Sequence, residues 1–236
     1  MNCLQYTMKL IATHALPIRA TGRFGAYLLL AGLLAACGVI DKPVRPTLYD
    51  FGPGAVTAPA NPASTTGAAV RQGLLPALVL GEIEAAGALD GSAVLYRLGY
   101  ADANQLRAYA QARWSAPPPQ LVRQRLREQL GRDRVVLNPG ESAALARADG
   151  AVPRVLRIEL EEFSHYFESA AQSSGLVRMR TTLLENTPAG EKLLAQRAIV
   201  VRRPAASADA PGGVRALAAA VDAAAEEIGL WLQQVR

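Results

Sequence analysis

Apolar and polar residues alternate along one stretch in the second half of the chain, which is the pattern of a half-buried strand. The apolar positions of this stretch are Leu156, Ile158, Leu160, Phe163, His165 and Phe167. The longer step from Leu160 to Phe163 breaks the period of two and predicts a β-bulge at Glu161-Glu162. Two further strands are expected, roughly over residues 176–185 and 193–202. The short glycine-containing links between the strands predict an antiparallel meander.

Two stretches have the apolar spacing of an amphipathic helix. Pro117-Pro118-Pro119 opens the first and Gly131 closes it, because proline favours the first turn of a helix and glycine the position after its end. The second runs from about Gly213 to Gln234. Its apolar stripe consists of Val214, Leu217, Val221, Ala224, Ile228, Trp231 and Val235. We expect this stripe to close the core, and a protein-binding face is the alternative.

The region before the first helix predicts shorter strands. Residues 74–84 and 93–100 read as two strands around a turn at Leu89-Asp90-Gly91-Ser92. A short strand is expected at 134–137 and an edge strand at 48–51. Together these elements predict one α+β domain, in which a mostly antiparallel sheet has two main helices packed on one face.

The N-terminal region has the layout of a secretory signal. Residues 24–36 carry no charge, and the charges before them are all positive: Lys9, Arg19 and Arg23. At about 1.5 Å per residue the apolar run spans roughly 20 Å, which is short of the roughly 30 Å hydrocarbon layer. Leu34-Ala35-Ala36-Cys37 resembles the lipobox of bacterial lipoproteins, in which the chain is cut before the cysteine and the thiol receives a lipid. The alternative is a buried cysteine at the end of an apolar segment.

These features predict three parts of the chain. Residues 1–36 form a lipoprotein signal peptide, 37–73 a lipidated cysteine followed by a Pro/Ala-rich tether, and 74–236 the α+β domain. Acyl chains such as palmitate on Cys37 would hold the protein on a membrane that it does not span. Bacterial lipoproteins with Asp after the cysteine tend to stay in the inner membrane. Because Gly38 stands there, the resemblance implies outer-membrane sorting facing the periplasm, with the inner membrane as the alternative.

Composition and charge narrow the class of protein. Hydrophobic residues make up 50% of the 236 residues and charged residues 19%, which is too apolar for a disordered chain. The net charge of +5 is mostly due to the three basic residues of the leader, so we expect no nucleic-acid partner. The densest basic cluster is Arg123, Arg125, Arg127, Arg132 and Arg134. It reads as a solvated helix face, and contact with anionic lipid or an acidic partner is the alternative.

The sequence offers little catalytic chemistry. His165 is the one histidine after the leader and Cys37 the one cysteine, so no zinc site of these ligands is expected. The chain has no phosphate-binding loop, dinucleotide fingerprint or G-x-S-x-G elbow. We therefore expect no catalytic residues, metal or cofactor. His165 reads as a satisfied, half-buried imidazole, and a hydrolase would require it within hydrogen-bond reach of a serine and a carboxylate. Glu159 and Glu161 most simply point to solvent.

A run of about forty residues resembles a known family. The pattern YR-x-x-Y, Y, RW and PP-x-x-L is matched by Tyr96, Arg97, Tyr100, Tyr109, Arg113, Trp114, Pro117, Pro118 and Leu121. This is similar to the ABC-type transport auxiliary lipoproteins, which include the paraquat-inducible protein C type. We refer to the nine residues as the motif residues. The resemblance makes them the candidates for partner binding.

The resemblance implies a non-catalytic outer-membrane lipoprotein that works with an ABC transporter whose periplasmic component carries MCE (mammalian cell entry) domains. Such systems move phospholipids or other hydrophobic molecules across the envelope. Some family members assemble as rings, so a homo-oligomer is possible. The alternative is a stand-alone envelope lipoprotein that binds lipid or scaffolds other proteins. A lipid carrier would need an apolar cavity inside the meander, whereas a docking module would have a filled core and an apolar or aromatic patch on its outer surface.

Overall fold

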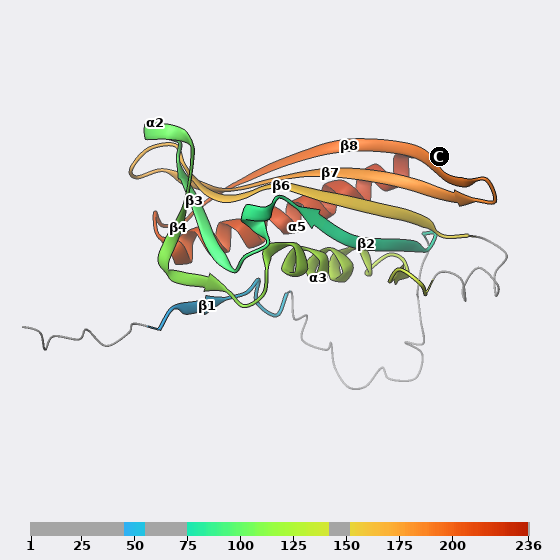
Figure 1. Ribbon diagram of the computed structural model, residues 1–236, viewed down its shortest axis with the longest axis horizontal. Coiled ribbons are helices and arrows are strands. Elements are labelled where there is room, and N and C mark those ends of the chain that lie inside the picture. Colours follow the sequence, from blue (N-terminus) through green and yellow to red (C-terminus); the bar gives the residue numbers. More distant parts are fainter. Residues whose placement is uncertain (1–44, 55–74, 142–151, 236) are drawn as a thin grey trace, which may run out of the picture. The chain divides into compact units, whose positions relative to one another are not determined.

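The computed structural model describes residues 45–54, 75–141 and 152–235 (Figure 1). The expected signal peptide, Cys37 and residues 55–73 of the expected tether lie outside the described residues. The strands are β1 Thr47–Tyr49, β2 Leu78–Ala85, β3 Ala93–Leu98, β4 Ala103–Trp114, β5 Val136–Leu137, β6 Arg154–Phe167, β7 Ser173–Thr187 and β8 Gly190–Pro204. The helices are α2 Gly99–Asp102, α3 Pro118–Leu130 and α5 Ala210–Gln234, with a 3-10 turn at Gly87–Leu89.

The predicted meander is confirmed. β6, β7 and β8 are long antiparallel neighbours, and β7 lies between the other two. The predicted β-bulge is also confirmed, because Leu160 pairs with Met179 and Glu162 pairs with the next residue along β7, Arg178. Glu161 is thus the extra residue of the bulge.

The other edge of β6 holds two short strands in series. β2 is parallel to the first half of β6, with Leu80 opposite Leu156, and β3 is parallel to its end, with Tyr96 opposite His165. The expectation that β2 and β3 surround a reversing turn is therefore wrong. Between them the 3-10 turn at Gly87–Leu89 carries the chain onward in the same direction.

The sheet as a whole is mixed, which corrects the prediction of a mostly antiparallel one. Four pairs of strands are parallel: β1 with β4, β2 with β5, β2 with β6, and β3 with β6. β3 and β4 form an antiparallel hairpin closed by α2. The class remains α+β. Alternation along a strand shows that it is half-buried, but it does not show which strand lies beside it or in which direction.

The two predicted main helices are confirmed and share one core with the sheet. α5 packs across β6, β7 and β8, and α3 packs against α5 and β2 (Figure 1). α5 begins where the side chain of Asp209 accepts a hydrogen bond from the Gly212 N–H. Its apolar stripe is buried from Val214 to Trp231, and Val235, just past the helix end, is partly buried. The stripe of α3 is buried too. A fully buried leucine such as Leu217 or Leu126 contributes roughly 1.5–3 kcal/mol.

The expected edge strand near 48–51 is confirmed as β1, which pairs with the end of β4 from Thr47 opposite Ala112 to Tyr49 opposite Trp114. Phe51 follows and places its ring 5.5 Å from that of Trp114, edge to face. This strand lies within the segment that the sequence assigns to the tether.

Candidate functional site

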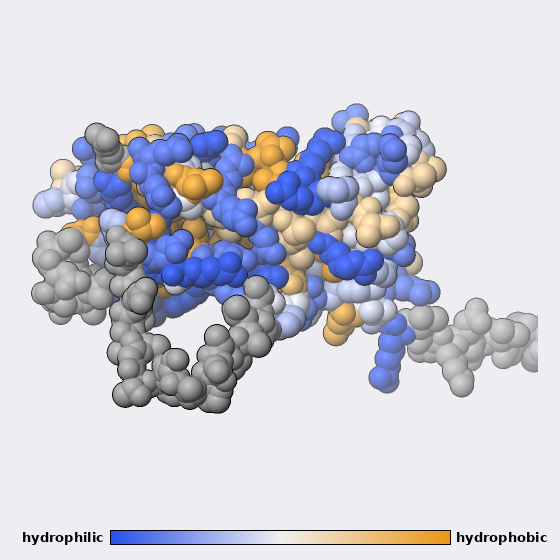
Figure 2. All heavy atoms as spheres, turned by 180° about the vertical axis from the view of Figure 1, so that it is seen from behind, coloured by the Kyte–Doolittle hydropathy of each residue, from blue (hydrophilic) through white to orange (hydrophobic). Residues whose placement is uncertain are grey.

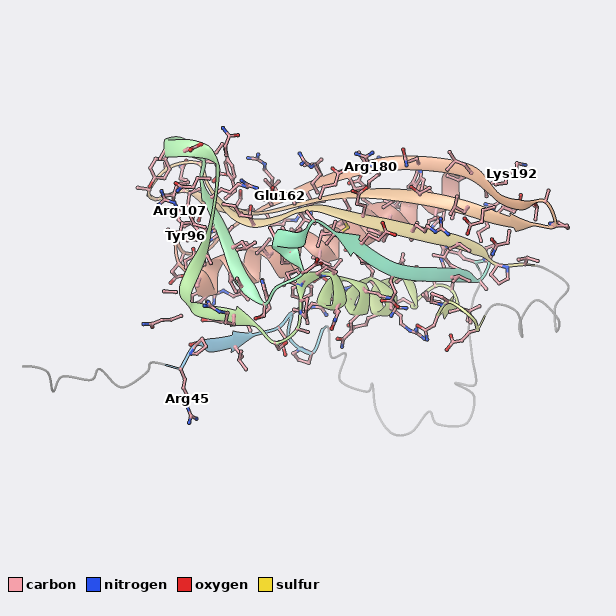
Figure 3. All side chains as sticks on the ribbon, viewed as in Figure 1. Arg45, Tyr96, Arg107, Glu162, Arg180 and Lys192 are labelled. Carbon is pink, nitrogen blue, oxygen red and sulfur yellow. The ribbon has the colours of Figure 1, made fainter. Side chains whose placement is uncertain are left out.

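The motif residues come from β3, α2, β4 and the start of α3. The β3–β4 hairpin, residues 93–114 with α2 at its tip, carries six of the nine. Figure 3 shows Tyr96 and Arg107 on the two strands of this hairpin and Glu162 on β6. The site is therefore built around the hairpin and its attachment to β6.

Arg97 ties the hairpin to the bulge of β6. Its Nε and Nη2 donate to the two carboxylate oxygens of Glu162, each at 3.0 Å. Its Nη1 donates to the carbonyls of Ala103 and Asn104 at 3.2 and 3.3 Å. Both side chains are largely shielded, with 19% of Arg97 and 13% of Glu162 exposed. A two-point, charge-assisted contact of this kind fixes geometry as well as adding energy.

Tyr96, Tyr109 and His165 attach the hairpin at a second point. The rings of Tyr96 and Tyr109 are 4.7 Å apart, and the Tyr109 hydroxyl lies 2.8 Å from Nδ1 of His165. His165 is fully buried, and burial lowers its pKa from 6.5 to about 4. Burial also raises the pKa of Tyr109, with Tyr96 adding to the shift. Both groups are therefore neutral at neutral pH and share one hydrogen bond between the hydroxyl and Nδ1.

The expectation of a satisfied, half-buried His165 is corrected in two respects. The residue is fully buried, and its Nε2 finds no hydrogen-bond partner among the described residues. The first turn of α5 presses on the ring, because a Cβ placed on Gly213 would lie 2.4 Å from the histidine Nδ1. Glycine is thus required here for close packing rather than for a special backbone conformation.

The remaining motif residues belong mainly to the core and its edge. Trp114 is only 1% exposed, and its ring lies 5.6 Å from that of Phe163. Arg113 donates to the carbonyls of Tyr109 and Ala112 at 2.6 and 2.8 Å. Pro117 precedes α3, whose residues Pro118 and Leu121 are buried.

Tyr100, at the tip of the hairpin, is 53% exposed, and the other motif residues face inward or are partly covered. The motif therefore forms a framework that holds the hairpin in place more than a continuous contact surface. This framework holds in place the edge of β4 that faces away from β3. β1 covers this edge only at residues 112–114, so within the described residues the stretch 103–111 pairs with β3 alone, at Leu106, Arg107 and Ala108. An exposed strand edge is a template for an added strand from another chain.

The basic cluster of α3 is largely bound within the fold. Arg123 donates to the Gly81 carbonyl at 3.1 Å, and Arg125 donates to the Phe51 carbonyl at 2.7 Å. Arg125 also lies 3.0 Å from Asp222 of α5. Arg127 bonds the side chain of Asn138. These three arginines join α3 to its neighbours, which corrects the reading of a solvated helix face.

The described residues offer little for catalysis. None of their histidine, cysteine and acidic side chains gather in a metal-binding group. The hydrogen bond of His165 goes to Tyr109, so the serine and carboxylate that a hydrolase would need at this imidazole are not there within the described chain. Glu161 pairs with Arg178 and Arg180 at 3.0 and 2.6 Å on the sheet face away from α5.

The core is filled where a lipid carrier would be hollow. The inward side chains of the meander, among them Val177, Met179 and Ile199, are buried under α5. Figure 2 shows hydrophobic residues exposed between hydrophilic ones on the face seen from behind. Among the helices of the described ranges, none is both long and apolar enough to cross a membrane.

Comparison with known proteins gives one family and one fold. The family model described as the ABC-type transport auxiliary lipoprotein component matches residues 57–229. No curated protein matches the chain. Protein XCC0632 from Xanthomonas campestris is similar in structure, with a TM-score of 0.57 and 16% identity, over 70% of this chain and 88% of that one. A protein described only as uncharacterized has a TM-score of 0.53 and 13% identity, over 80% of this chain and 99% of its own. At these identities the likeness shows the fold alone.

Proposed function

Since the chain belongs to the family of ABC-type transport auxiliary lipoproteins, we propose that it is the outer-membrane docking component of an envelope transport system. The family itself implies a lipid-anchored envelope protein associated with an ABC transport system. The periplasmic partner in this proposal carries MCE domains, and the cargo is lipid or another hydrophobic molecule. The chain contributes attachment rather than catalysis.

The observation that carries the proposal is a filled core combined with a firmly held open strand edge. Arg97 and Tyr109 fix the β3–β4 hairpin to β6, while residues 103–111 of β4 keep one edge unpaired within the described chain. A docking module needs such a rigid, presented surface because binding then costs little ordering of the chain. The filled core favours docking over the stand-alone lipid carrier.

Anchoring at Cys37 limits how far the domain can stand from the membrane. β1 begins at Thr47, so the folded part starts only ten residues after the proposed anchor. At about 3.5 Å per residue this link spans at most about 35 Å. We therefore place the tether at residues 38–46, and the domain stays close to the outer-membrane surface.

A crosslinked pull-down tests the proposal. The natively lipidated protein is captured from crosslinked membranes, and its partners are identified by mass spectrometry, with Cys37→Ser as the unanchored control. Recovery of an MCE-domain protein in an anchor-dependent manner is the expected result. Repeated recovery of no transporter component, with the anchor intact, would favour the stand-alone envelope lipoprotein. Crosslinks between copies of the chain would support the homo-oligomer that the family resemblance implies.

A further inference from the structure

A cleft of about 380 Å³ opens where β2 and β6 begin and α5 ends. Its walls are mainly apolar and include Leu75, Leu78, Leu183 and Leu232. Two guanidinium groups, those of Arg134 and Arg154, also line it, and no acidic residue does within the described chain. Clefts of this size with apolar walls and a few polar groups are typical of small-molecule sites.

Arg134 is the unusual member of this cleft. Only 8% of the residue is exposed, yet it makes no hydrogen bond or ion pair with any described residue. By contrast, Arg123 and Arg125 on α3 are each held by carbonyl or carboxylate oxygens. Burial lowers the pKa of Arg134, and the neighbouring Asp133 only partly opposes this. Its guanidinium nitrogens are not among the fully buried, unpartnered polar atoms of the described residues, so they reach the solvent of the cleft and are free to bind an anion there.

Arg154 adds a second cation on the same wall. Its Nη1 donates to the Val235 carbonyl at 3.0 Å, just past the end of α5. This bond uses one of the five N–H donors of a guanidinium and holds the side chain in place. Arg134 further borders a second surface cleft of about 350 Å³ between α3 and α5, beside the exposed Leu230. The walls of that second cleft also carry the carboxylates of Asp133 and Glu226, so the candidate anion site is the first cleft alone.

The combination selects one class of ligand. A small inorganic anion would make no apolar contacts with the leucine walls, and an uncharged apolar molecule would leave Arg134 unpaired. We propose that this cleft binds the anionic head, a carboxylate or a phosphate, of an amphiphile whose acyl chain lies against Leu75, Leu78 and Leu232. The planar guanidinium matches either head with two parallel hydrogen bonds. This inference concerns the chain itself and does not depend on the proposed docking to a transporter.

Photolabelling of the full-length lipidated protein in dodecyl maltoside tests the inference. The probes are palmitate, phosphatidic acid and hexadecanol, each with a diazirine in the acyl chain, and the adducts are mapped by mass spectrometry. Palmitate or phosphatidic acid should label peptides that contain residues 75–78 or 232–235, and the neutral alcohol should label them far less. The two anionic probes distinguish a free fatty acid from a membrane phospholipid as the source.

Matched variants decide whether Arg134 carries the binding. Arg134→Gln should lower labelling of these peptides about ten-fold, as expected for loss of hydrogen bonds to a charged group, and Arg132→Gln, at an exposed neighbour, should not. If Arg134→Gln does not fold, competition by unlabelled palmitate against unlabelled hexadecanol on the unaltered chain gives the same answer. Equal labelling by the alcohol, adducts elsewhere, or labelling unchanged in folded Arg134→Gln would overturn the inference. Capture of an MCE-domain protein by Arg134→Gln remains as in the unaltered chain, so the two proposals fail separately.

Discussion

At the scale of single residues, Arg97 and Glu162 form a shielded ion pair that holds the hairpin on β6. Arg97→Gln leaves a shielded carboxylate without its cation, so we expect a loss of about 1–3 kcal/mol in the free energy of unfolding. The matched control is Arg157→Gln, because Arg157 is 55% exposed and pairs with Glu191 at 2.6 Å. Such an exposed pair is worth about 0–1 kcal/mol. Urea unfolding measures both, and equal losses would contradict the assigned role of Arg97.

His165 makes the stability of the fold depend on pH. Its pKa falls from 6.5 to about 4 on folding, so between these values the unfolded chain binds more protons than the folded one. Stability from this residue is therefore complete above about pH 6.5 and decreases as the pH falls toward about 4, by about 3 kcal/mol in total. His165→Gln should flatten this part of the stability profile. An imidazole that titrates near 6.5 by NMR in the folded protein would contradict the account.

The sequence did not predict which groups bind the charged side chains. The arginines on α3 read as one basic face because only their spacing is visible there. The structure places the Gly81 and Phe51 carbonyls and Asp222 against them, all from distant parts of the chain. The sequence likewise placed His165 on the apolar face of its strand, but not beside Tyr109.

At the scale of elements, two of the three glycines of α5, Gly213 and Gly229, have opposite expected effects. Alanine in place of glycine in a helix gains about 1 kcal/mol from propensity. At Gly229 the added Cβ meets only Leu130 at 3.8 Å, so Gly229→Ala should stabilise by up to that amount. At Gly213 the Cβ would lie 2.4 Å from the His165 ring, so Gly213→Ala should destabilise despite the gain. Thermal unfolding of the two variants checks this, and stabilisation by both would mean that α5 does not press on His165.

How much of the fold the sequence predicts depends on how each element is buried. β6 has strong alternation and α5 a continuous apolar stripe because each buries one face, and both were predicted. β4 was not predicted as a strand, since most of its side chains are exposed and the segment 103–111 shows no alternation. The series arrangement of β2 and β3 along β6 was missed because sequence patterns do not encode strand partners. For the candidate site, partner binding by the motif residues stays a prediction. The sequence did not show that Arg97 contacts Glu162 or that the motif residues hold the hairpin on β6.

At the scale of the whole molecule, the proposed anchor predicts where the protein is found. The unaltered chain should fractionate with the outer membrane, and Cys37→Ser should lose that location because no acyl chain remains to hold it. Gly38→Asp should shift the protein toward the inner membrane, and Gly38→Ala serves as its control. Membrane separation on a sucrose gradient measures all four. An inner-membrane location of the unaltered chain would contradict outer-membrane sorting.

The open edge of β4 offers the most direct test of docking. The photocrosslinker p-benzoylphenylalanine is placed at Gln105, on the open edge of β4, and in parallel at Gln196, an exposed glutamine on β8. Within the described residues β8 pairs only with β7, so its outer edge is open too, and the comparison asks whether docking uses the β4 edge in particular. After irradiation of cells that carry the lipidated protein, the crosslinked partners are identified by mass spectrometry. We predict that Gln105 captures an MCE-domain protein and Gln196 captures several-fold less. Equal capture from both positions, or capture of no transport component from Gln105, would contradict docking through the β3–β4 hairpin.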